Sequence, residues 1–378
     1  MRKILILLFV LLSVLIHIKL AYSYEVVIGI KNRVNYDLVD YQIRINLSKY
    51  QFTYPYLVRV TDYNGTDIPF CYEQDNGKCY DAPTNIIWVK VPYIPANGLA
   101  IIRIYNDTVN YARDGSEVFD IYEDLVNGTA YGFQLKCGSL ASGYNYIEVT
   151  GSGDVGPTIV STKPVTLSPG IFISTIVQAW GSTKPFESRA FIALVKDPNG
   201  IVCGLSPPYG PATLGTWYSI AGMSEFDNFI GAQTYGSSSY TTTSIPDGYV
   251  DYQIRNITYW FYGTRTYFKF GNYSVYNDGN FYQNIPVYIA FVGRGAYGTG
   301  STYRLYSYII VGKYANPEPI VFVLYNSSIS AQVPSQTTSN YTFIYKYSQP
   351  IKIVSNSIIG ISDIVIPITI DTRTLISQ

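Results

Sequence analysis

Most of the chain alternates apolar and polar residues over short runs, which glycine, proline, asparagine and aspartate interrupt. The runs are rich in valine, isoleucine, tyrosine and threonine, residues that favour strands. Beyond the N-terminal segment, no stretch sustains the 3.6-residue apolar period of a helix. The pattern therefore predicts an all-β protein. Only residues 117–125 are expected to form a short helix or a turn-like connection.

A first set of predicted strands lies between residues 25 and 125. In the second of them, Val39, Tyr41, Ile43 and Ile45 are expected on one face, with polar residues between them. One buried and one polar face are typical of an antiparallel β-sandwich, and Trp88 is expected in its core. The predicted strands are Glu25–Ile30, Val39–Ile45, Leu57–Val60, Ile86–Val91 and Ala100–Tyr105.

The rest of the chain divides into a second sandwich and a tail. Within residues 129–325, the runs Val250–Ile254 and Thr266–Phe270 have the pattern of paired sandwich strands. A flexible connection rich in Ser, Thr, Gln and Asn is expected from residue 326 to 342. Isoleucines then alternate over residues 363–371, which predicts a strand that packs on the sandwich or adds to the edge of a neighbouring subunit.

These patterns predict two antiparallel β-sandwich domains in tandem, over residues 24–128 and 129–325, and a short C-terminal β segment within residues 326–378. Several runs in the first domain carry a resemblance to a known family: Leu38–Ile45, Asp62–Pro69, Ile87–Ala96, Ile104–Asp107 and Glu117–Asp120. Residues 25–125 thereby resemble a domain family of unknown function found in exported archaeal and bacterial proteins. The family has no catalytic assignment to carry over.

A second resemblance concerns Tyr308–Pro319. This segment is similar to the strand that closes a concanavalin A/laminin-G-like sandwich, a domain that often follows the first family. Tyr308 and Ile309 replace an Asp-Trp pair there, and Gly312 replaces a charged residue. The resemblance implies that the second domain binds glycans or proteins through loops at one edge.

The N-terminal residues have the order of a secretory signal peptide. Arg2 and Lys3 precede the apolar run Ile4–Ile16, and small residues at Ala21 and Ser23 suit cleavage after Ser23. The apolar run is shorter than the roughly 20 residues that span a bilayer. The alternative is an uncleaved single anchor formed by residues 4–22. In both cases the protein is expected to be secreted or on the cell surface.

Composition limits the partners of the exported chain. Removing 23 residues leaves 378 − 23 = 355, and Lys+Arg falls from 26 to 26 − 3 = 23 against 26 Asp+Glu, a net charge of −3. Nucleic acid is therefore not an expected partner. Only 14% of residues are charged while 39 are tyrosine, which suits an adhesive surface. The same composition follows equally from an amino-acid bias of the lineage.

The single histidine, His17, lies in the signal segment. Its loss excludes His-dependent nucleophiles, His-ligated zinc and His general acid–base catalysis, so no enzyme is expected. A glycosidase that uses Glu225 and Asp227 is the minor alternative, but a second glutamate that would complete the pattern is missing. The glycine-rich segment Gly293–Gly298 has no helix after it and is interpreted as a turn.

Four cysteines remain after export. Cys71 and Cys79 flank an Asn-Gly turn signal and are expected to form a local disulfide. By elimination, Cys137 and Cys203 then form a longer one. Eight Asn-x-Ser/Thr sequons predict N-glycosylation, at Asn46, Asn64, Asn106, Asn127, Asn256, Asn272, Asn326 and Asn340.

Candidate ligand-binding residues lie in the second domain. Aromatic side chains at Trp180, Trp217, Tyr218 and Trp260 are candidates to stack on sugar rings, although such residues are more often core than ligand platform. Hydroxyl-orienting groups are expected at Asp227 and Asn228; calcium there has no supporting motif, so no cofactor is expected.

The hypothesis is a non-enzymatic surface glycoprotein that binds glycan or protein ligands. The first alternative is a structural subunit of an archaeal surface layer, filament or virus particle that self-associates through its C-terminal strand.

Overall fold

The structure is a computed structural model that describes residues 24–326 except 53–55, 75–76, 153–155, 182–189, 202, 204–216, 225–228, 238–240, 245–253 and 294–300. The described part is built almost entirely of antiparallel strands in two β-sandwiches, which belong to one compact unit. This confirms the predicted all-β class. The expected signal segment and the C-terminal tail lie outside the described residues.

The first sandwich consists of two four-stranded sheets, ordered β24-β1-β7-β3 and β2-β6-β4-β5. Alternating apolar side chains such as Val26, Ile28 and Ile30 of β1 fill the space between them. Its strands are β1 Glu25–Lys31, β2 Leu38–Asn46, β3 Val58–Asp62, β4 Phe70–Glu73, β5 Cys79–Tyr80, β6 Ile86–Ile94, β7 Leu99–Asn106 and β24 Ile320–Asn326.

The second sandwich also consists of two sheets. One has the order β10-β11-β23-β14-β19-β20-β21, with β8 paired to β23, and the other β18-β17-β16-β15-β22-β12-β9, with β13 paired to β22. The strands are β8 Ile121–Asp124, β9 Phe133–Cys137, β10 Ser139–Gly143, β11 Tyr146–Thr150, β12 Thr158–Ser161, β13 Val165–Thr166, β14 Gly170–Gly181, β15 Ala190–Val195, β16 Trp217–Ser224, β17 Phe229–Thr234, β18 Thr241–Ser244, β19 Arg255–Tyr262, β20 Arg265–Phe270, β21 Tyr273–Asp278, β22 Pro286–Gly293 and β23 Ser301–Tyr314.

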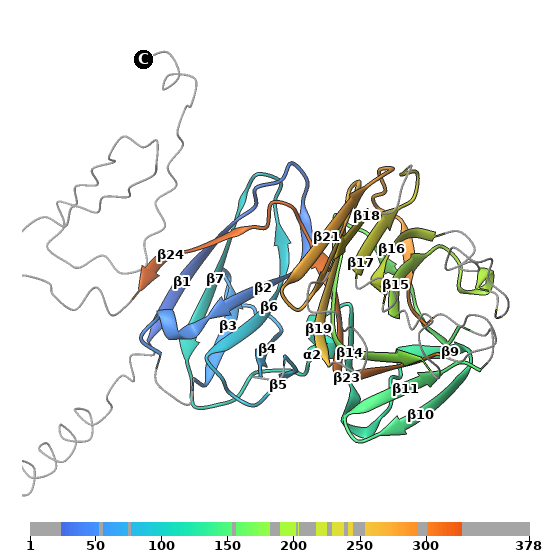
Figure 1. The fold of residues 1–378 in the computed structure, drawn as a ribbon. Coiled ribbons are helices and arrows are strands. Elements are labelled where there is room, and N and C mark those ends of the chain that lie inside the picture. The colour runs from blue at the N-terminus through green and yellow to red at the C-terminus, as the bar shows by residue number, and fades with distance from the viewer. Residues whose placement is uncertain are drawn as a thin grey trace, which may run out of the picture. The chain divides into compact units, whose positions relative to one another are not determined.

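The order of strands along the chain does not follow the division into two sandwiches. The last described strand, β24, pairs with β1, and Figure 1 shows the two side by side although they come from opposite ends of the colour scale. Strand β8 instead pairs with β23 of the second sandwich. The boundaries expected at residues 128 and 325 therefore do not coincide with the sheets: 121–124 joins the second sandwich and 320–326 completes the first.

Helical structure is confined to single turns in the described residues. Helix α2 spans Gly115–Val118, and the side chain of Asp114 accepts a hydrogen bond from the Ser116 N–H at its start. Short 3₁₀ turns occupy Leu47–Lys49, Leu125–Asn127 and Pro198–Gly200. The region expected to be helical thus holds the end of α2, the strand β8 and a 3₁₀ turn. Among the described residues, no helix is long and apolar enough to cross a membrane.

Two expectations about side-chain orientation in the first sandwich are wrong. Val39 is 51% exposed because Asp40 adopts a positive φ of 49°, which interrupts the alternation of β2 before Tyr41. Tyr41, Ile43 and Ile45 are buried as expected. Trp88 lies outside the core of its sandwich, since it is only partly buried and packs in a separate cluster with residues of the second sandwich.

Candidate functional site

A cleft of about 290 Å³ lies where the two sandwiches meet. One wall comes from β2, β4 and β6 of the first sandwich, and the other from β14, β19 and β23 of the second. We call this the inter-sandwich cleft. Its lining residues are Gln42, Arg44, Glu73, Gly77, Trp88, Phe172, Ser174, Thr258, Trp260, Tyr308, Ile310, Lys313 and Glu318.

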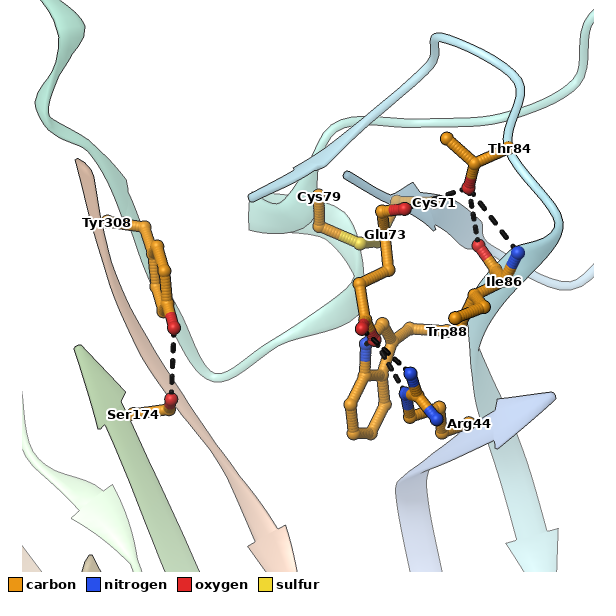
Figure 2. Close-up of polar contacts among 9 residues, drawn as sticks. All are labelled: Arg44, Cys71, Glu73, Cys79, Thr84, Ile86, Trp88, Ser174 and Tyr308. Carbon is orange, nitrogen blue, oxygen red and sulfur yellow. Dashed lines mark hydrogen bonds and ion pairs between the residues drawn. A yellow bond between two sulfur atoms is a disulfide. The ribbon is translucent and has the colours of Figure 1, made fainter. Parts of the chain in front are cut away.

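The first wall is held by a three-residue polar network on neighbouring strands (Figure 2). Arg44 donates to both carboxylate oxygens of Glu73, at 2.7 and 2.9 Å. The indole N–H of Trp88 donates to the same carboxylate at 2.7 Å. A bidentate arginine–carboxylate pair has a fixed geometry, so the network sets the position of the Trp88 ring in the wall.

The second wall is the outer face of the sheet that contains β14, β19 and β23. The Phe172 ring stacks on Trp88 across the cleft, with centroids 5.9 Å apart and planes 21° apart. Ser174 and the Tyr308 hydroxyl lie 3.3 Å apart, as Figure 2 shows. Burial raises the pKa of Tyr308, so its hydroxyl keeps its proton throughout the neutral range. Trp260 is partly buried on this wall and contacts Tyr267 edge-on.

A disulfide-closed hairpin connects the walls. Cys71 and Cys79 form the predicted disulfide between β4 and β5. In the hairpin, Gly77 has a φ of 82°, and a Cβ added there would lie 2.7 Å from the Tyr308 ring. The ammonium group of Lys78, which is 2% exposed, lies 2.6 Å from a carboxylate oxygen of Asp124 in β8. The hairpin therefore anchors the first wall to the second sandwich.

Hydrogen bonds between one side chain and the backbone complete the junction of the walls. The Gln42 side chain donates to the carbonyl of Val118 at 2.9 Å and accepts from the N–H of Lys313 at 2.8 Å. Gln42 lies on the polar face of β2 and is only 3% exposed, because the second sandwich covers it. The cleft is thus built mainly on strands of two sheets, with Gly77 and Glu318 added from the connections between strands.

The cleft is lined by aromatic rings and by charged groups whose charges sum to zero. Arg44 and Glu73 neutralise each other, and Lys313 and Glu318 add one charge of each sign. Hydroxyl groups come from Ser174, Thr258 and Tyr308. Aromatic faces with a few fixed polar groups suit ligands that carry both C–H and O–H surfaces.

The structure separates the ligand-binding residues expected from the sequence. Trp260 lines the inter-sandwich cleft. Trp217 and Tyr218 lie on β16 in the opposite sheet, where Trp217 contacts Tyr235 and Tyr218 contacts Tyr282. Positions outside the described residues are Glu225, Asp227 and Asn228, most of the run 250–254, the glycine-rich segment from 294 onward, and the side chain of Trp180. The sequence did not identify Trp88, Arg44 and Glu73 as a site, because their common position follows only from strand pairing.

All four cysteines form disulfides, since Cys137 and Cys203 are also paired.

Among the sequons, the asparagines at 64, 127, 256 and 272 are exposed. Asn46 and Asn106 are partly buried, and the Asn46 side chain accepts hydrogen bonds from the Ser48 backbone N–H and hydroxyl. The Asn326 side chain and Asn340 lie outside the described residues. Glycosylation stays a prediction at all eight sites. The described residues contain no cluster of three or more His, Cys, Asp or Glu that could hold a metal.

Comparison with known proteins gives one family match. Residues 56–133 match a family described as a domain of unknown function, DUF2341, which agrees with the resemblance of the first domain. No curated protein matches the chain.

Solved structures similar to about half of the chain include lectin-type domains. The Emp47p carbohydrate recognition domain matches at 9% identity and a TM-score of 0.41, over 52% of this chain and 96% of that domain. A legume lectin-like domain from Entamoeba histolytica matches at 12% and 0.36, over 49% and 91%. A lectin from Bauhinia forficata in complex with GalNAc matches at 11% and 0.39, over 51% and 98%. At these scores, no ligand is inferred for this chain.

Proposed function

We propose that this protein is an exported, non-enzymatic glycan-binding protein that holds a sugar in the inter-sandwich cleft. The observation that carries the proposal is the pairing of aromatic rings with hydrogen-bonded polar groups on the two facing walls of the cleft. Trp88 and Trp260 offer apolar ring surface. The hydroxyl groups of Ser174, Thr258 and Tyr308 are suited to bind the hydroxyl groups of a sugar, which lose hydrogen bonds to water when the sugar enters the cleft.

The arrangement of Glu73 supports a binding role rather than a catalytic one. Its carboxylate accepts two hydrogen bonds from Arg44 and one from Trp88. The bidentate arginine fixes this carboxylate in the wall, where it positions the Trp88 ring. Export supports the same role, because the expected signal peptide would place the cleft where external glycans occur. Protein ligands and self-association through residues 343–378 stay predictions from the sequence.

The test is a glycan array probed with purified residues 24–378, followed by calorimetric titration of the strongest ligand. We expect Trp260→Ala to weaken binding about tenfold, since loss of one aromatic contact is worth about 1.4 kcal/mol. Trp217→Ala, which changes the same residue type in the opposite sheet, should keep the wild-type affinity. Absence of any bound glycan on an array of neutral and acidic oligosaccharides would contradict the proposal.

A further inference from the structure

Four aromatic residues lie opposite one another across neighbouring strands of the sheet that forms the second wall. Phe172 of β14 pairs with Trp260 of β19. Trp260 pairs with Tyr267 of β20, and Tyr267 pairs with Tyr276 of β21. We call these four residues the aromatic row. It begins in the inter-sandwich cleft and ends at the edge strand of the sheet.

The aromatic row lies on the outer face of the sheet. Side chains alternate between the two faces along each strand, and the neighbours Ile171, Tyr259, Phe268 and Val275 are buried in the core of the second sandwich. The row residues therefore face away from that core. Strands in a sheet are about 4.8 Å apart, so four residues in register extend about 14 Å across it.

The far end of the row opens into a second hollow. Tyr276 is 53% exposed and borders a groove of about 460 Å³ between the edge strands β18 and β21. The Arg265 guanidinium lies 4.5 Å from the centre of the Tyr276 ring and donates to both carboxylate oxygens of Asp278 at 2.7 Å. This pair fixes Tyr276 at the edge of the sheet.

The groove at this end is lined mainly by polar residues, and hydrogen bonds of Asn277 hold two of its strands together. Its lining residues are Thr241, Thr243, Ser274, Val275, Tyr276, Asn277 and Asp278. The Asn277 amide donates to the Thr241 hydroxyl at 2.8 Å, and its oxygen accepts from the backbone N–H of Thr234 at 2.8 Å. A hydroxyl that accepts one hydrogen bond still has a proton to donate to a ligand.

Polar residues accompany the aromatic row on both sides. On one side, Ser174 pairs with Thr258, Thr258 with Lys269, and Lys269 with Ser274. On the other side, Tyr262 pairs with Arg265, and Arg265 with Asp278. The face thus presents a row of rings with hydrogen-bonding groups beside it, on one side from β14 to β21 and on the other from β19 to β21.

We infer that the inter-sandwich cleft and the groove between β18 and β21 are the two ends of one track that binds a linear polysaccharide across the strands. The inference rests on the proposed function and specifies its ligand as an extended chain rather than a single sugar. Rings that recur at the strand spacing of about 4.8 Å match a ligand whose units repeat along its length. The C–H faces of the sugar units lie on the row, and their hydroxyl groups meet the polar bands.

The test is a length series of the glycan that binds best, from disaccharide to hexasaccharide, titrated into the full exported chain. Wild-type affinity is expected to rise about tenfold or more with length, as each further ring contact adds to binding. Tyr276→Ala should abolish this rise and leave disaccharide affinity within about twofold of wild type, because the shortest ligand occupies only the cleft. Tyr276→Phe, which keeps the ring, should keep the rise.

Tyr131→Ala serves as the matched control, since Tyr131 is 86% exposed and lies outside the row. An affinity that does not rise with length, or a rise that survives in Tyr276→Ala, would overturn the extended track. The proposed function would then stand if binding still depended on Trp260. If the wild type binds no glycan of any length, both the proposed function and the track are overturned.

Discussion

Lys78 is a charged side chain that the fold has removed from water. It is 2% exposed, and its partner Asp124, at the end of β8, is 29% exposed. The Tyr80 hydroxyl donates to the same carboxylate. Burial alone would raise the pKa of Asp124, but the hydrogen bonds from Lys78 and Tyr80 outweigh it and hold this pKa below its usual range. The pair therefore stabilises the junction of the two sandwiches at neutral pH and loses this effect as acid protonates Asp124.

We predict that Lys78→Ala lowers the free energy of unfolding by about 2 kcal/mol, because it leaves Asp124 without its cation. The value lies below that of a fully buried pair because Asp124 reaches solvent. Urea denaturation at pH 7 measures the change, with the exposed Lys269→Ala as control. An equal stability of the two variants would show that the pair does not hold the junction.

The pKa of Glu123 is shifted in the opposite direction to that of Asp124. Glu123 is 8% exposed, and one of its carboxylate oxygens accepts from the N–H of Gly132 at 2.6 Å. Burial raises the pKa of Glu123, and the N–H groups of Tyr131 and Gly132 oppose this only in part. Because the folded-state pKa lies above the unfolded value of about 4.3, the stability that Glu123 contributes is complete at lower pH and is lost as pH rises through the folded-state pKa.

Glu123→Gln is therefore predicted to gain stability relative to the wild type as pH rises from about 4 to 7. The glutamine keeps the oxygen that accepts from Gly132 but has no charge to bury. Denaturation of both proteins across this range gives the difference in unfolding free energy. A difference that is constant with pH would contradict the raised pKa.

At the scale of elements, the β4–β5 hairpin connects the first wall of the cleft to the second sandwich. Cys71 and Cys79 close it, and Glu73, which positions Trp88, lies at the end of β4. Loss of this disulfide should loosen the wall as well as the fold. The disulfide between Cys137 and Cys203 lies in the second sandwich, where neither cysteine lines the cleft.

Replacing both Cys71 and Cys79 by Ala is predicted to lower unfolding stability by about 2 kcal/mol, as expected for a short closed loop. Glycan affinity should fall at the same time, because Glu73 and Gly77 lose their fixed positions. The matched variant lacks Cys137 and Cys203, whose longer loop should cost more stability but no affinity. The reverse ranking of affinities would show that the hairpin does not order the cleft.

Local sequence patterns predicted where many strands lie, but not where a strand departs from regular alternation. Thr266–Phe270 lies within β20 and Ile86–Val91 within β6, because alternation of buried residues is a property of each strand alone. The positive φ of Asp40 is not visible in that alternation, so the orientation of Val39 was missed. Residues 121–124 gave no strand signal because their sequence, Ile-Tyr-Glu-Asp, does not alternate apolar and polar residues, and its one buried side chain is Glu123.

For the whole molecule, sequence patterns predicted two sandwiches but not how the chain is shared between them. The pairing of β24 with β1 joins residues about 300 positions apart, and no local signal specifies such a pair. The cleft has the same origin: Trp88 and Phe172 meet through the packing of the two sandwiches. Trp260 was identified by residue type alone, while its neighbours in the cleft follow only from topology.

A glycan bound in the inter-sandwich cleft is expected to continue along the aromatic row. A crystal structure of residues 24–378 with the best-binding oligosaccharide tests it most directly. We expect sugar rings over Trp260, between the two walls, with further rings towards Tyr276. A sugar bound instead at Trp217 and Tyr218 on the opposite sheet, with the cleft filled only by water, would contradict it.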